Sequence, residues 1–283
     1  MGSTLFVKDD FKDSTLVLIG HGSTLNADSS APTHQHAEEL ERRGIFGQVL
    51  TAFWKEEPSI CAVLRAAFKA RVFCVPLFIS EGYFTEEVIP RELGFAAGER
   101  VRVSGGQKIF YCGPIGTHES MTEVLLARAR EIVAKHPFPR APKPAETALF
   151  IAGHGTGNNE NSRKAIERQV ELIRARNEYA EVHAAFMEED PRIGDCYAAA
   201  KATNIVITPF FISDGLHSFE DIPMMLGEPK RLVRARLAAG KPTWRNPTER
   251  KEKLVWYAPS IGNEPHIADV ILERVREAAR QRG

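Results

Sequence analysis

Short apolar runs alternate with charged, helix-forming segments along this chain, and the order occurs twice. Four apolar runs bounded by polar or glycine positions predict buried strands in the first half, at residues 16–19, 48–53, 72–78 and 108–112. The segments around them predict helices at 33–43, 58–69 and 119–134. The second half predicts strands at 148–152, 181–186 and 205–211 and helices at 160–176 and 265–280. This alternation predicts an α/β fold with parallel sheets flanked by helices.

The two halves share motifs at a constant spacing. Gly153-His154-Gly155-Thr156 resembles Gly20-His21-Gly22-Ser23, which stands 133 residues before it (154 − 21 = 133). Each copy follows an apolar run, as expected where a buried strand reaches the carboxyl edge of a parallel sheet. Phe186 to Pro191 repeats Phe53 to Pro58 at the same spacing. The sequence therefore predicts two tandem similar domains.

We place the domain boundary at a proline-rich stretch. Residues 1–136 form the first predicted repeat, 137–144 a linker with four prolines, and 145–283 the second repeat. Ile115-Gly116 matches Ile261-Gly262 at a spacing of 146, so the second repeat has a net insertion of 13 residues (146 − 133 = 13). The insertion is basic, and a solvated surface loop is its simplest interpretation.

Composition excludes several classes of function. Lys plus Arg and Asp plus Glu both total 37 in 283 residues, so no bulk charge indicates a nucleic-acid or membrane partner. The first fourteen residues are polar, and no apolar stretch approaches the roughly 20 residues of a membrane helix. The four cysteines form no CxxC pair and are expected to be buried thiols. We expect a cytoplasmic protein.

Comparison of the repeats identifies candidate chemistry. The second half has His154, Glu188 and His217 at the ends of three predicted strands, and these positions hold His21, Lys55 and Phe84 in the first half. Two imidazoles and a carboxylate can bind a divalent cation, and neutral imidazole also accepts protons near neutral pH. The alternative is that these polar side chains only satisfy backbone groups at loop edges.

The motifs of both halves resemble the class II chelatases of the CbiX type. The resemblance rests on the apolar run before His-Gly-Ser/Thr, the Phe-x-Glu-x-x-Pro segment and Gly-Leu-His-Ser-Phe-Glu-Asp-Ile-Pro, and it covers both halves almost completely. It implies a long form built as a fused dimer, expected to be monomeric. It also implies a lyase that inserts a divalent metal into sirohydrochlorin, a tetrapyrrole of cobalamin and sirohaem biosynthesis, at a cleft between the halves.

The resemblance assigns roles to individual residues. His154, His217 and Glu188 become the catalytic and metal-contacting residues. The expected contacts to the carboxylate-rich substrate are His21, Lys55, Phe84 and Arg163, and the insertion offers Arg231, Arg234 and Arg236 as further cations. No organic cofactor is expected, because the divalent metal is itself a substrate, with cobalt favoured over iron and nickel.

Two questions stay open from the sequence. The family pattern leads us to expect an active amino-terminal half, yet Lys55 and Phe84 replace an acid and a histidine there. Either the carboxyl-terminal half is active, which we favour, or His21 contributes from an altered half. A non-catalytic carrier of metal or tetrapyrrole, derived from a chelatase, is the alternative function.

Overall fold

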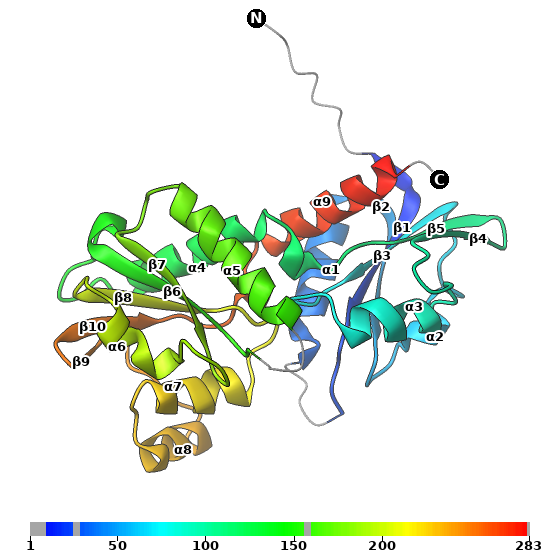
Figure 1. Ribbon diagram of the computed structural model, residues 1–283. Helices are drawn as coiled ribbons and strands as arrows, with labels where there is room; N and C mark the ends of the chain where they lie inside the picture. The colour runs from blue at the N-terminus through cyan, green and yellow to red at the C-terminus, as the bar shows by residue number, and fades with distance from the viewer. Residues whose placement is uncertain (1–9, 25–28, 156–159, 282–283) are drawn as a thin grey trace, which may run out of the picture. The chain divides into compact units, whose positions relative to one another are not determined.

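The computed structural model describes residues 10–24, 29–155 and 160–281, and its internal contacts divide the chain into two compact units. Unit 1 comprises Met1–Leu77, Tyr83–Gly113 and Ile271–Gly283. Unit 2 comprises Phe78–Gly82 and Pro114–Val270. Each unit contains one five-stranded sheet with helices packed against it, which confirms the predicted α/β class (Figure 1).

Unit 1 is built on a sheet with the strand order β2-β1-β3-β5-β4. Its three pairs β1–β2, β1–β3 and β3–β5 are parallel, and β4 pairs with β5 in the antiparallel sense. Helix α1 packs on β1 and β2 and is capped by Gly44, whose φ of 63° is the left-handed conformation that glycine adopts at low cost. The elements are β1 (Phe11–Gly20), α1 (Ala31–Arg43), β2 (Phe46–Phe53), α2 (Ile60–Val63), β3 (Arg71–Pro76), α3 (Ile89–Glu92), β4 (Val101–Ser104) and β5 (Gln107–Tyr111).

Unit 2 repeats this topology with the strand order β7-β6-β8-β10-β9. The pairs β6–β7, β6–β8 and β8–β10 are parallel, and β9 is antiparallel to β10. The elements are α4 (Met121–Lys135), β6 (Thr147–Gly153), α5 (Glu160–Ala175), β7 (Glu181–Phe186), α6 (Cys196–Ala199), β8 (Asn204–Pro209), α7 (Ile222–Met225), α8 (Lys230–Ala238), β9 (Thr248–Arg250) and β10 (Lys253–Tyr257). The last helix, α9 (Ile267–Arg280), begins in unit 2, and its residues from Ile271 onward belong to unit 1.

The sheet of unit 2 is apolar on both faces, as expected of a parallel sheet between helices. Ala148, Phe150 and Ala152 of β6 alternate along the strand and join a cluster with Ile193 and Ile222. The alternate positions of β6 are equally buried, on the face that α4 and α5 cover (Figure 1). All three residues of the predicted stripe of α5 are at most 3% exposed: Ile166, Val170 and Ile173.

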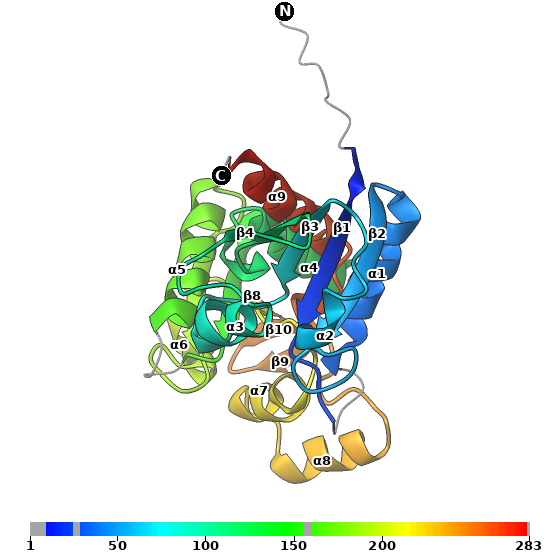
Figure 2. The same cartoon turned by 90° about the vertical axis from the view of Figure 1, so that its right-hand side faces the viewer.

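Several local predictions were wrong in extent. The helix predicted over 58–69 is only α2, because residues 64–66 form turns directly after Val63. The strand predictions omitted β4 in the first half and both β9 and β10 in the second. The basic insertion is not simply a surface loop, since it contains α8, which packs beside α7 (Figure 2).

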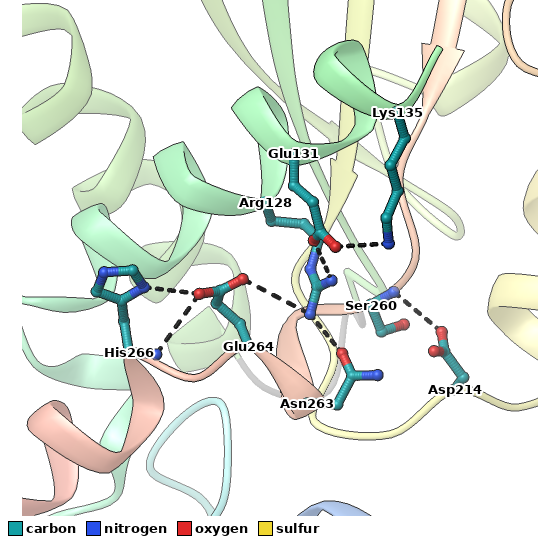
Figure 3. A network of polar contacts seen from close by, with 8 residues as sticks. All are labelled: Arg128, Glu131, Lys135, Asp214, Ser260, Asn263, Glu264 and His266. Atoms are coloured by element: carbon teal, nitrogen blue, oxygen red, sulfur yellow. Dashed lines mark hydrogen bonds and ion pairs between the residues drawn. The ribbon is translucent and has the colours of Figure 1, made fainter.

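Helix α4, which the repeat assigns to the first half, packs against β8 and β10 of unit 2. Its Arg128 is 4% exposed, and its guanidinium donates to Glu131 on the same helix and to Asn263 beyond β10 (Figure 3). The buried Glu264 carboxylate lies 3.9 Å from this guanidinium and accepts a hydrogen bond of 2.6 Å from the His266 ring (Figure 3). The proline-rich segment 137–144 also lies within unit 2. The compact units therefore differ from the sequence repeats in where they place α4, whereas the repeat boundaries stay a prediction.

Glycines repeated between the halves mark close backbone approaches. A Cβ atom on Gly116 would lie 2.0 Å from the carbonyl oxygen of Ile79, and one on Gly262 would lie 1.4 Å from that of Ile212. Only glycine fits where two backbones meet at such distances. The Ile-Gly pair that defines the second repeat spacing thus has a structural reason.

The four cysteines are free thiols, as predicted, although Cys61 is exposed. Burial raises the pKa of the Cys74 and Cys196 thiols to about 12 in each case, and burial also raises the pKa of Cys112. These three groups therefore stay protonated and unreactive at neutral pH. In the described part of the chain, no helix is both long and apolar enough to cross a bilayer.

Candidate active site

His154 follows the carboxyl end of β6, and its main chain joins this strand to the loop after β7. Its carbonyl oxygen accepts hydrogen bonds from the amides of Met187 and Glu188, at 3.0 and 3.1 Å. Because β6 and β7 are neighbouring parallel strands, these bonds fix Glu188 beside the histidine. Glu188 Oε1 lies 3.7 Å from His154 Nε2. This gap is too long for a direct hydrogen bond, but a divalent ion about 2.1 Å from each atom could bridge it.

His217 comes from the segment after β8, where it opens a π-helical turn, His217–Asp221. Its ring centroid lies 5.0 Å from that of His154, with the two planes at 80°. Its Nδ1 atom lies 2.7 Å from Asp221 Oδ2, and its ring lies 6.3 Å from that of Phe211. The structure therefore places Glu188 and His217 each beside His154 at the carboxyl edge of the unit 2 sheet.

The three side chains are open to solvent. The exposed fractions of the side chains of His154, Glu188 and His217 are 31%, 58% and 51%. Among the residues that the structure describes, no three His, Cys, Asp or Glu side chains converge to form a ready-made metal centre. The arrangement offers nitrogen and oxygen donors that can reach an ion or a proton arriving from solvent.

A buried tyrosine of β10 forms a hydrogen bond to the π-helical turn that carries His217. The Tyr257 hydroxyl of β10 donates to the carbonyl oxygen of Ser218 at 2.8 Å. Burial raises the pKa of Tyr257 well above its usual range, so the hydroxyl remains a donor. In unit 1, Tyr111 donates in the same way to the carbonyl of Thr85, at 2.6 Å. The recurrence shows that this bond belongs to the framework of both repeats.

The second glycine of each Gly-His-Gly motif has a positive φ, 65° at Gly155 and 68° at Gly22. A Cβ atom there would lie 2.7 Å from Glu189 Oε1 in the second half and 2.8 Å from Glu56 Oε1 in the first. The glycine is therefore required by backbone conformation and space in both halves, whether or not the histidine is functional. Thr156, the last residue of the motif, lies outside the described residues.

Arg163, a predicted substrate contact, is engaged within unit 2. Its guanidinium forms ion pairs with Glu167 at 2.8 Å and Glu189 at 3.2 Å, and it donates to the carbonyl of Asp190 at 3.0 Å. It also lies 4.9 Å from the centroid of the Phe186 ring. Hydrogen bonding to Glu167 raises the pKa of Arg163. These contacts hold the loop after β7, and a role in substrate binding stays a prediction.

The first-half counterparts adopt the same backbone arrangement with different chemistry. The His21 carbonyl accepts hydrogen bonds from the amides of Trp54 and Lys55, at 3.2 and 3.0 Å. The Phe84 ring takes the place of His217 and lies 5.2 Å from the His21 ring and 5.9 Å from that of Trp54. Tyr83, which is 61% exposed, extends this aromatic group at 6.1 Å from Phe84. Unit 1 therefore has a group of aromatic side chains at the positions where unit 2 has imidazole and carboxylate groups that can bind a metal.

The insertion is attached to the turn that carries His217. Arg234 of α8 pairs with Glu220 of the π-helical turn at 2.8 Å. Arg236 pairs with Glu228 at 3.1 Å. Of the three arginines proposed as substrate contacts, Arg234 docks the insertion on this turn, Arg236 pairs within the insertion, and Arg231 is exposed on α8.

The sequence predicted no role for Asp221, whose carboxylate lies within hydrogen-bond distance of the His217 ring. The signal was present, because an acid four residues after a histidine shares its side of a helical turn. Recognising it requires residues 217–221 to be helical, and the sequence analysis predicted no helix there.

Comparison with known proteins agrees with this architecture. The CbiX family model matches residues 15–132 and 148–278, so the chain belongs to the CbiX family. The chain is 40% identical over 278 residues to the probable sirohydrochlorin cobaltochelatase of Halobacterium salinarum, covering 93% of this chain and 91% of that protein.

Two solved structures share the fold. A multi-domain protein of Deinococcus radiodurans, described as similar in structure to chelatases, matches 95% of this chain with a TM-score of 0.76 and 29% identity. The match spans 56% of that longer protein, which has two additional domains. SirB from Bacillus subtilis with Fe3+ matches 94% of this chain and 96% of its own, with a TM-score of 0.66 and 18% identity. At this identity, the SirB match shows the fold alone.

Proposed function

We propose that this protein is a metal chelatase that inserts a divalent metal into sirohydrochlorin, with Co2+ as the first candidate substrate and Fe2+ and Ni2+ behind it. The observation that carries the proposal is the meeting of His154, Glu188 and His217 at adjacent strand ends of unit 2. The 40% identity to a probable sirohydrochlorin cobaltochelatase supports the choice of substrate and metal. The second half is then the active half.

The reaction exchanges two ring protons for one metal ion. The tetrapyrrole loses two N–H protons as the metal enters, so the site must deliver the ion and accept protons. His154 and Glu188 are spaced to share an ion, and His217 lies against the His154 ring. We assign metal contact and proton acceptance to the two imidazoles, with Glu188 balancing the charge of the ion. The exposure of all three side chains supports exchange with incoming substrate.

The test is insertion by the purified full chain with sirohydrochlorin and Co2+, Fe2+ or Ni2+, followed by absorbance without oxygen and corrected for the protein-free rate. We expect many turnovers per chain with at least one metal, and the fastest rate with Co2+. Saturation at one equivalent without turnover would instead identify a carrier of metal or tetrapyrrole.

We extend the proposal to the first half, where His21, Lys55 and Phe84 contact the tetrapyrrole rather than the metal. The aromatic surface around Phe84 suits the flat macrocycle, and the Lys55 ammonium suits its carboxylates. Phe84→Ala is expected to raise the KM for sirohydrochlorin about 2- to 10-fold, with kcat changed little. Initial rates at varied tetrapyrrole concentration measure this split.

The matched control is Phe68→Ala, which removes an aromatic ring of unit 1 that is 69% exposed and is in no contact with the Phe84 group in the described structure. The control should leave both kinetic constants unchanged. A Phe84→Ala variant with lower kcat and an unaltered KM would count against a role in substrate binding.

A further inference from the structure

We infer that Asp221 is a positioning residue that holds the His217 imidazole with Nε2 free to bind the incoming metal or accept a proton. The inference rests on the proposed function, because it assigns Asp221 a task within that reaction. The His217 Nδ1 atom lies 2.7 Å from Asp221 Oδ2. A carboxylate oxygen accepts from an N–H donor, so this contact favours the tautomer with the hydrogen on Nδ1. In a neutral ring, the lone pair is then on Nε2.

The turn that carries both residues is anchored on each side. Ser218 is 3% exposed, and its hydroxyl donates to the carbonyl of Gly215 at 3.1 Å. Ile222, directly after Asp221, is fully buried. His217 and Asp221 themselves are 51% and 35% exposed in their side chains. Pairs at such exposure contribute little to folding stability, so the contact is poorly explained as a structural one.

The first repeat provides an internal comparison. Its turn, Phe84–Val88, is also π-helical and has the same length as His217–Asp221. The histidine is replaced there by Phe84 and the acid by Val88, whereas the following Ile-Pro pair is kept at Ile89 and at Ile222. The turn therefore forms without an acid at its last position. The acid is present only in the repeat that has the imidazole.

A neighbouring acid does not take the same role. Glu220 precedes Asp221 on the turn, but its carboxylate pairs with Arg234 of α8 at 2.8 Å. Glu188, the other acid of the site, lies 3.7 Å from His154. The carboxylate that orients the His217 ring is therefore that of Asp221.

The experiment uses the full chain labelled with 15N-histidine, in the wild type and in Asp221→Ala, Asp221→Asn and Glu220→Gln. Long-range 15N–1H correlation spectra at pH 8, where imidazoles are mostly neutral, report which ring nitrogen carries the proton. The peak that disappears in His217→Ala assigns the ring. We expect His217 protonated on Nδ1 in the wild type and in Glu220→Gln. In Asp221→Ala we expect a mixture dominated by the Nε2-protonated form.

Kinetics provide the second readout. Asp221→Ala is expected to raise the KM for the metal about 10- to 100-fold, the usual loss when the partner of a ligating histidine is removed. The KM for the tetrapyrrole should stay unchanged. Asp221→Asn should recover part of the loss, because the amide oxygen still accepts from Nδ1–H. Glu220→Gln removes a charge from the same turn and should not raise the KM for the metal.

Two results would overturn the inference: His217 remaining protonated on Nδ1 in Asp221→Ala, or an Asp221→Ala metal KM equal to that of Glu220→Gln. Absence of turnover by the wild type with any of the three metals would defeat the proposed function instead. The spectra do not depend on turnover, so they would still decide whether Asp221 sets the protonated nitrogen of His217.

Discussion

His154→Ala and His217→Ala are each expected to lower kcat/KM for metal insertion about 100-fold or more under limiting metal. Each change removes an imidazole to which the proposal assigns metal contact and proton acceptance, and positioned acid–base groups contribute rate factors of this size. His154→Ala removes the imidazole that lies 3.7 Å from Glu188. His217→Ala removes the ring that lies edge-on against the His154 ring. Initial rates at varied metal concentration, with sirohydrochlorin in excess, measure the loss.

His21→Ala is the matched control, because the same Gly-His-Gly motif stands in the first half without its acid and second histidine. We expect a changed KM for the tetrapyrrole and a kcat within a few-fold of wild type. The His217 change should not unfold the protein, since its side chain is 51% exposed and substitutions at such positions usually cost under ~0.5 kcal/mol. The His154 side chain is 31% exposed, so the fold of that variant is checked by its urea midpoint. Wild-type insertion by both second-half variants, with a strong loss in His21→Ala, would move the active site to the first half.

The strand framework was readable from the sequence because buried parallel strands carry a strong local signal. The predicted run at 181–186 coincides with β7, and the spacing of 133 places His154, Glu188 and His217 at corresponding strand ends. Parallel neighbours end at the same edge of a sheet, so the meeting of these side chains followed from topology alone.

Features set by tertiary contacts were not readable in the same way. The antiparallel edge strands β4 and β9 are short, with burial patterns that lack the apolar runs of central strands. Helix α4 belongs to the first sequence repeat but packs on β8 and β10 of the second. The pattern of apolar residues in α4 shows that one face is buried, but it does not show which sheet covers that face. The contact of Asp221 with His217 depends on a π-helical turn. A single turn of this kind is too short to produce a periodic pattern of apolar residues from which it could be predicted.

Solvent exposure at the site bears on the choice between enzyme and carrier. A carrier that stores a metal benefits from ligands that are enclosed and shielded, whereas a chelatase must receive the ion and pass it on. The exposed fractions of 31% to 58% for His154, Glu188 and His217 fit the second requirement. The acid and the second histidine of the second half have no counterpart in the first, which supports the proposal that the second half is the active one.

Arg128→Ala is expected to lower the free energy of unfolding of unit 2 by about 3–5 kcal/mol. The guanidinium is nearly enclosed, with its side chain 5% exposed, and it contacts Asn263 as well as Glu131 and Glu264 (Figure 3). Its removal takes this cation from the Glu264 carboxylate, which is 6% exposed and keeps the hydrogen bond from the His266 ring, and breaking a buried ion pair by removing one partner has a cost of that size. Urea unfolding followed by tryptophan fluorescence measures the effect, because the buried Trp244 and Trp256 are both in unit 2.

Arg130→Ala on the same helix is the matched control, since its pair with Glu178 at 2.6 Å is half exposed and should contribute less than about 1 kcal/mol. Adding Glu264→Gln to Arg128→Ala should recover part of the lost free energy of unfolding, because a buried carboxylate without its arginine partner is replaced by a neutral amide. Equal urea midpoints for Arg128→Ala and Arg130→Ala would show that α4 is held to the unit 2 sheet by its apolar face alone. A loss that the added Glu264→Gln does not reduce would assign the cost to the Asn263 and Glu131 contacts instead of the buried carboxylate.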